Sequence, residues 1–198
     1  MFMQVIRGHT NDPQGLKGKM DEWKERLMPG SIGYLGSTGG VADDGTAVLV
    51  ARFDSVEAAR ENSNRPEQDA WWAEASKYFD DDPTFSDYTQ IRTQRAGGSD
   101  DAGFVQLIQG RVKDTKRAQE LDEEFGDMGG RPDLIGATTG YNDAGEFTTV
   151  AYFTSEAEAR EGESQEMPAE MQEGMKEWME LMDNPSYIDL RDPWLTSK

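Results

Sequence analysis

The strongest constraint on the fold is that one pattern occurs twice in the sequence. Residues 2–8 read FMQVIRG and residues 104–110 read FVQLIQG, so the second copy begins 104 − 2 = 102 positions after the first. In the middle of each copy the offset is 100 positions, and it returns to 102 at Pro83 and Pro185. A period of half the chain is too long for a solenoid, so the pattern indicates two related small domains.

The repeat gives an expected domain organisation. The expected boundaries are residues 1–95 for the first repeat, 96–103 for a flexible linker rich in glycine and aspartate, and 104–198 for the second repeat. Each repeat is large enough for a modest core. Two fused repeats can form within one chain the assembly that a homodimer forms from two chains. Further association between whole chains stays open. Residues that both copies share are expected to serve the scaffold, and the others to be specialised or to have drifted.

Composition argues against several classes of partner and chemistry. The chain has 39 acidic and 20 basic residues and a net charge of −19, and such a surface repels phosphate backbones and anionic lipids. Neither nucleic acid nor a membrane is therefore an expected partner. With no cysteine and one histidine, thiol chemistry and the usual metal clusters are not expected, so we expect no metal and no cofactor. The N-terminus does not resemble a signal peptide, which favours a cytoplasmic location.

Each copy follows the same order of strands and helices. The first copy has a strand over 2–8, a helix capped by Asp12, strands over 32–40 and 46–53 joined by a turn at Gly45, a short helix capped by Ser55, a helix through Trp71, and a strand after Pro83. This order, β-α-β-β-α-β, predicts an α+β fold of two tandem ferredoxin-like repeats. The strands are apolar on both sides, so we expect the repeats to cover each other as a pseudo-dimeric α/β barrel.

Three local patterns carry a resemblance to a known family. The opening strand F-x-Q-x-I-x-G, the hairpin at Gly45 and the stretch FDSVEAAR at residues 53–60 resemble the dimeric α/β barrel superfamily, in particular its antibiotic-biosynthesis-monooxygenase-like branch. The resemblance covers both copies and is closer to tandem actinobacterial proteins of unestablished function. The superfamily includes cofactor-free oxygenases of polyketide quinols, haem-degrading monooxygenases and proteins without a known reaction. The resemblance therefore implies a fold and leaves the activity open.

A polar segment of the first copy contains the candidate catalytic residues. Asn62 and Arg65 precede the pair Trp71 and Trp72, and the second copy has neither the arginine nor the paired tryptophans. A guanidinium beside an amide can hold a carboxylate, phenolate or enolate oxygen, which makes Arg65 and Asn62 the candidate catalytic pair. The alternative is that Arg65 caps a helix or pairs with an Asp. Because only the first copy has the segment, we expect the functional pocket there.

Aromatic and amide side chains complete the candidate ligand site. Trp23, Trp71 and Trp72 have the flat surfaces that stack on a flat ligand, and the alternative is that they fill a core. Gln4 lies in the opening strand, as does Gln106 in the second copy, and its amide either faces the cavity or fixes the structure. Haem-degrading relatives supply a helix histidine to iron, whereas the single histidine here, His9, ends a strand. Haem binding is therefore not expected.

These observations leave two function classes. The first is a small-molecule-handling protein whose ligand is apolar or aromatic, like a phenol or a quinol. If catalytic, it would be a cofactor-independent monooxygenase in which the substrate anion activates oxygen. The second is a non-catalytic ligand-binding or protein-interaction protein. Oxygen uptake with a candidate quinol distinguishes the two classes.

Overall fold

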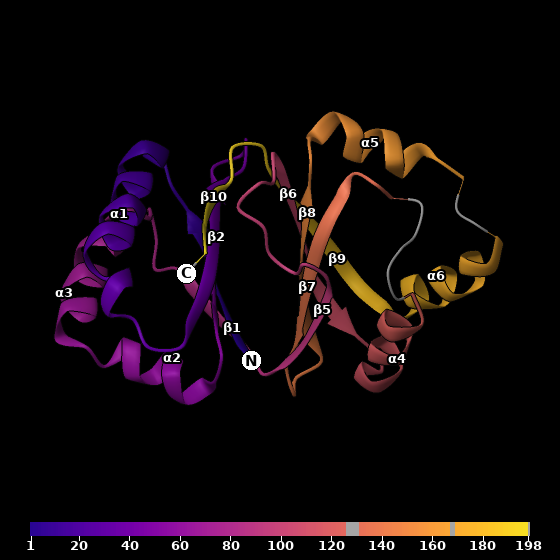
Figure 1. The fold of residues 1–198 in the computed structure, drawn as a ribbon, viewed down its shortest axis with the longest axis horizontal. Coiled ribbons are helices and arrows are strands. Elements are labelled where there is room, and N and C mark those ends of the chain that lie inside the picture. The colour runs from indigo at the N-terminus through magenta and orange to yellow at the C-terminus, as the bar shows by residue number, and fades with distance from the viewer. Residues whose placement is uncertain (126–130, 167–168, 198) are drawn as a thin grey trace. The chain divides into compact units, whose positions relative to one another are not determined.

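The computed structural model describes residues 1–125, 131–166 and 169–197. The chain forms two compact units: unit 1 is Met1–Thr89 with Leu190–Lys198, and unit 2 is Gln90–Asp189. Each unit contains one five-stranded sheet. Within each unit the helices lie on one face of the sheet (Figure 1). The predicted α+β fold of tandem ferredoxin-like repeats is therefore confirmed.

The elements of unit 1 follow the predicted order. They are β1 (Phe2–His9), α1 (Pro13–Arg26), the short helix η1 (Met28–Gly30), β2 (Tyr34–Val41), β3 (Thr46–Phe53), α2 (Val56–Ser63), α3 (Pro66–Ala75), η2 (Ser76–Tyr78), β4 (Thr84–Tyr88) and β10 (Trp194–Ser197). The strands stand in the order β10-β2-β3-β1-β4. No helix in the described parts of either unit has the length and hydrophobicity that crossing a membrane requires.

Local chemistry explains where these elements begin. The Asp12 carboxylate accepts a hydrogen bond from the Gly15 N–H at 2.8 Å and caps α1, as predicted. Ser55 caps α2 in the same way by accepting from the Ala58 N–H at 3.2 Å. At the β2–β3 turn Gly45 has a φ of +85°, a conformation that costs other residues energy. The caps and the turn were therefore readable from sequence.

Unit 2 repeats this arrangement. Its elements are β5 (Gln90–Arg95), β6 (Phe104–Val112), α4 (Thr115–Phe125), β7 (Leu134–Tyr141), β8 (Glu146–Phe153), α5 (Glu156–Ser164), α6 (Ala169–Leu181) and β9 (Met182–Leu190). Their order in the sheet, β5-β7-β8-β6-β9, matches that of unit 1 strand for strand. Asp114 accepts from the Arg117 N–H and Ser155 from the Glu158 N–H, so the helix caps are repeated as well.

The fifth strand of each sheet comes from the other repeat. β10, which follows β9 in the chain, pairs antiparallel with β2 and places Leu195 opposite Thr38. β5, which follows β4, pairs with β7 and places Thr93 opposite Thr138. The ferredoxin-like pattern predicted four strands in each sheet, and the exchanged strands supply the fifth. They pair backbone groups that an open edge would leave unpaired. Residues 96–103, the expected linker, thus connect two strands of one sheet.

Candidate functional site

A cavity of about 810 Å³ lies between the helices and the sheet of unit 1. Its lining comes from β1, β2, β3, β4 and β10 on the sheet side and from α1, α2 and α3 with their connections on the helix side. Side chains alternate along a strand, so Phe2, Gln4 and Ile6 of β1 present one face to it. Small-molecule sites typically measure about 300–1,000 Å³, and this cavity falls in that range.

Aromatic rings form much of the cavity wall. Four of the five tryptophans of the chain line it: Trp23, Trp71, Trp72 and Trp194. The ring centroids of Trp23 and Tyr34 are 4.9 Å apart, and those of Trp71 and Trp72 are 6.0 Å apart. These are the distances of packed aromatic pairs. The structure therefore brings the three predicted tryptophans together and adds a fourth from the exchanged strand β10.

The tryptophans differ in how much they offer a ligand. Trp23 donates its indole N–H to Gln68 at 2.7 Å, and Trp71 donates to the Lys19 carbonyl at 3.1 Å. Trp71 is buried and packs against Leu27 and Ala75, and it also lines the cavity. Trp72 is half-buried, and its indole has no hydrogen-bond partner among the described residues. The side chain best placed to contact a ligand is therefore Trp72.

Asn62 lines the cavity, but its amide is fully engaged. The amide nitrogen donates to the Ile32 carbonyl at 2.6 Å and to the Ala58 carbonyl at 2.8 Å. The amide oxygen accepts from the Ile32 N–H and from Arg65, each at 3.2 Å. Two donated and two accepted bonds use the capacity of an amide side chain. Asn62 thus ties α2 to the segment that leads into β2.

Arg65 lies outside the cavity lining. Its Nε donates to Glu67 at 2.9 Å, and its two terminal nitrogens donate to the Leu27 carbonyl, at the end of α1, at 3.3 and 3.4 Å. The bonds to the Leu27 carbonyl agree with the alternative of a helix cap, and the acid partner is Glu67, where the sequence suggested an Asp. The catalytic role predicted for Arg65 and Asn62 stays a prediction, without a contact that favours it.

Gln4 lines the cavity and is held by an acid of the neighbouring strand. Its amide nitrogen donates to Asp87 of β4 at 2.8 Å. In unit 2, Gln106 donates to Asp189 at 2.9 Å, and both residues stand 102 positions after their counterparts. A contact that is present in both copies serves the shared scaffold. Gln4 is therefore a fixed polar group in the wall.

Opposite charges balance in the cavity lining of this acidic protein. The charged lining residues are Lys17, Lys24, Arg60, Asp21, Asp69 and Asp87, which gives 3 − 3 = 0. Lys17 and Asp21 neutralise each other at 2.7 Å. The whole chain carries −19, so the cavity is much less acidic than the average of the protein. An anionic ligand meets less repulsion here than over the rest of the surface.

His9, the only histidine, is not part of this lining. Its Nδ1 lies 2.5 Å from the Asp80 carboxylate, and its Nε2 lies 2.9 Å from the Asp44 carbonyl oxygen. The hydrogen bond to Asp80 is the main cause that raises the pKa of His9, and the Asp44 carbonyl adds to it. Both ring nitrogens are engaged at the end of β1. The cavity therefore offers no imidazole to a haem iron.

The sequence did not single out two lining residues, Trp194 and Arg60. Trp194 reaches the cavity on β10, an exchanged strand that no local pattern assigns to this sheet. Arg60 belongs to a stretch that both copies share, which favoured a scaffold role. Arg60 differs from Arg160, its counterpart in unit 2, in the residues that surround it on the helix.

Comparison with known proteins identifies relatives by fold. No family model and no curated protein matches the sequence. A candidate monooxygenase from Lactobacillus acidophilus NCFM has a TM-score of 0.73 at 15% identity, covering 99% of this chain and 96% of that one. One from Fusobacterium nucleatum has a TM-score of 0.77 at 11% identity, covering 100% and 94%.

A third solved structure, of an anthrone oxidase-like protein, has a TM-score of 0.64 at 11% identity and covers 100% of this chain and 94% of that one. At these identities the likeness is one of fold, and fold does not establish activity. The matches extend over both repeats of this chain. The chain therefore shares its fold, over both tandem repeats, with two candidate monooxygenases and an anthrone oxidase-like protein.

Proposed function

We propose that the protein binds a flat, largely apolar aromatic molecule, of the phenol or quinol kind, in the cavity of unit 1. The observation that carries the proposal is a cavity of about 810 Å³ whose wall holds four of the five tryptophans. Trp72 and Phe85 stand with their ring centroids 5.4 Å apart, and Phe85 is 52% exposed. An exposed ring edge beside a half-buried indole suits a flat partner.

The catalytic form of the proposal is a cofactor-independent monooxygenase. This form takes a phenol that also carries an activated ring CH2 group: its anion reduces O2, the CH2 group becomes C=O, and the second oxygen atom leaves as water, so CH2 + O2 gives C=O + H2O. The cavity would hold the substrate and exclude water from the reacting carbon. The likeness in fold to a candidate monooxygenase and to an anthrone oxidase-like protein supports this form. A ligand-binding protein without turnover is the second candidate.

Two corresponding aromatic residues give a matched binding test. Phe85 of unit 1 and Tyr187 of unit 2 are 102 positions apart and are 52% and 57% exposed, but Phe85 lines the cavity. Phenols and quinols that raise the melting temperature of the unchanged protein are titrated into that protein and into the Phe85→Ala and Tyr187→Ala variants, and the affinities are compared. We expect Phe85→Ala to weaken binding about two- to tenfold, the effect of one aromatic contact, and Tyr187→Ala to leave it unchanged. Equal effects would refute the unit 1 site.

Oxygen uptake separates the two forms of the proposal. A binding phenol that carries a ring CH2 group, such as an anthrone, is mixed with the protein in an oxygen electrode, and the rate is compared with spontaneous oxidation of the same compound. The catalytic form predicts uptake that saturates with substrate and falls in Phe85→Ala. Binding that gives no uptake above the spontaneous rate would rule out the catalytic form and leave the binding protein.

A further inference from the structure

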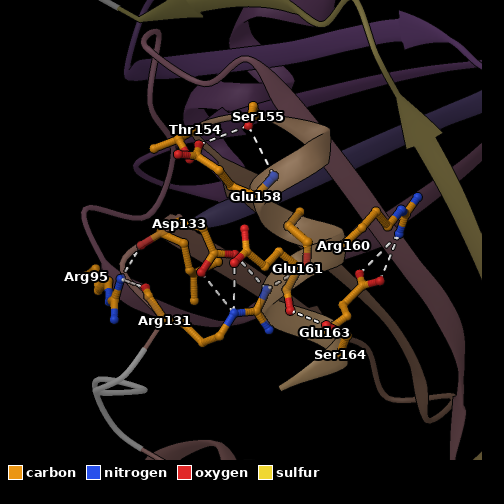
Figure 2. Close-up of polar contacts among 12 residues, drawn as sticks. Arg95, Arg131, Asp133, Thr154, Ser155, Glu158, Arg160, Glu161, Glu163 and Ser164 are labelled. Carbon is orange, nitrogen blue, oxygen red and sulfur yellow. Dashed lines mark hydrogen bonds and ion pairs between the residues drawn. The ribbon is translucent and has the colours of Figure 1, made fainter. Parts of the chain in front are cut away.

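The corresponding arginines of the two units have different surroundings. In unit 2, Arg160 of α5 pairs with Asp189, with Glu163 at 3.1 Å (Figure 2) and with Glu156 at 3.4 Å. Its guanidinium carbon also lies 5.2 Å from the centroid of the Phe104 ring. Three acids and an aromatic face therefore contact Arg160, and its charge is paired within unit 2.

Arg60 is the same residue in unit 1, 160 − 60 = 100 positions earlier, and it lines the cavity. Two of the acids have no counterpart, because Val56 stands where unit 2 has Glu156 and Ser63 stands where unit 2 has Glu163. Arg60 is exposed and pairs with no acid in the part of the chain that the structure describes. The change of neighbours on α2 thus leaves this guanidinium available.

The third acid is retained but does not take up the charge. Asp87 of β4 corresponds to Asp189, and it accepts from Gln4 as Asp189 accepts from Gln106. In unit 2 the second carboxylate oxygen of Asp189 binds Arg160, whereas the described contacts of Asp87 include no arginine. With 39 acidic and 20 basic residues, a shortage of acids does not explain an unpaired arginine at a cavity.

We propose that Arg60 is the anion contact of the cavity and that the ligand is an aromatic anion with a phenolate or carboxylate oxygen at one edge. The inference rests on the proposed function, because it assumes that an aromatic molecule occupies the cavity. The aromatic wall takes the ring system, and the forked guanidinium takes the oxygens. The neutral lining removes the repulsion that the rest of this acidic chain would exert on such an anion.

Two fluorescent probes separate the charge contact from the aromatic contact. The anionic probe is 8-anilinonaphthalene-1-sulfonate, whose sulfonate stands in for the ligand's anionic oxygens. The neutral probe is N-phenyl-1-naphthylamine, the same ring system without the sulfonate. We expect Arg60→Gln to weaken the anionic probe about tenfold and to leave the neutral probe unchanged, because one charge-assisted hydrogen bond is lost. Arg160→Gln is the matched control and should change the affinity of neither probe.

The outcomes distinguish this inference from the proposed function. If the neutral probe binds and Phe85→Ala weakens it, but Arg60→Gln does not weaken the anionic probe, the role of Arg60 is refuted and the aromatic site stands. If Arg60→Gln and Arg160→Gln weaken the anionic probe equally, the contact is not specific to unit 1 and the inference fails. If neither probe responds to Phe85→Ala, the proposed site itself fails. The expected pattern is a loss with Arg60→Gln for the anionic probe alone.

Discussion

Unit 1 and unit 2 share a strand order but differ in the layer between helices and sheet. In unit 2, Tyr141 donates to Asp122 at 2.6 Å, and Thr139 and Thr149 share a hydrogen bond of 3.0 Å. Unit 1 has Val41, Met20, Gly39 and Leu49 at these positions. Three of the four, Met20, Gly39 and Leu49, line the cavity. The duplication thus kept the scaffold, and the two copies differ where a ligand would sit.

The units also solve one packing problem with different residues. In unit 1 the amide of Asn62 bonds to the backbone of Ile32 and fixes α2 to the chain. In unit 2 the corresponding residue is Gly162, and a Cβ there would lie 2.4 Å from Nε of Arg131. Arg131 bonds instead to Asp133 (Figure 2) and to the carbonyl of Ala159. A difference between the two copies at one position is therefore not enough to show that the position is functional.

The largest expected effect is the loss of the Arg131–Asp133 pair in unit 2. Arg131 pairs with Asp133 at 2.7 Å and holds the pKa of that carboxyl below its usual value, and the Asp133 side chain is only 7% exposed. Arg131→Ala leaves a buried carboxylate unpaired, which typically costs about 3–5 kcal/mol. Urea unfolding at pH 7 measures the loss. A loss below about 1 kcal/mol would contradict the view that this pair replaces Asn62.

The second prediction tests the polar interior of unit 2 through pH. Burial raises the pKa of Asp122 from 3.8 to about 6. The folded state then holds the proton more tightly than the unfolded state, so stability falls as pH rises from about 4 to 6. Asp122→Asn should remove this dependence and stabilise the protein at pH 7 by about 2–3 kcal/mol. Urea unfolding at pH 5 and pH 7 measures both effects.

The control for the pH prediction is Glu173→Gln, which removes an exposed carboxylate from α6 of the same unit. This variant loses one negative charge, as Asp122→Asn does, but the lost carboxylate is exposed and not buried. We expect its unfolding free energy to differ from that of the unchanged protein by less than about 0.5 kcal/mol at either pH. Equal gains from the two variants would show that the total charge, and not the buried Asp122, sets the pH dependence.

The smallest expected effect separates the two arginines of unit 1. Arg65 pairs with Glu67, which is 56% exposed, and bonds to the carbonyl of Leu27. Arg65→Ala should cost about 1 kcal/mol of stability and leave the affinity for the anionic probe unchanged. Arg60→Gln should show the reverse pattern. A tenfold loss of probe affinity in Arg65→Ala, with the stability unchanged, would restore Arg65 as the ligand contact that the sequence suggested.

The sequence by itself determined the duplication, the β-α-β-β-α-β order within each copy and the starts of the capped helices. These features rest on interactions between residues close in the chain. Asp12 and Ser55 cap the helices that begin beside them, and Gly45 supplies the turn between adjacent strands. Helical spacing also located the aromatic cluster. Aromatic residues spaced at the helical period lie on the helix face that packs on the sheet, and this does not depend on which sheet residues they contact.

Only the tertiary structure decided the exchanged strands and the contacts of each polar side chain. Backbone pairing at a sheet edge carries little side-chain information, so nothing local assigns Trp194 of β10 to the sheet of unit 1. A guanidinium or an amide bonds to whatever acceptor folding brings near. The structure therefore fixes Asn62 and Arg65 in the scaffold and leaves Arg60 at the cavity without an acid partner among the described residues.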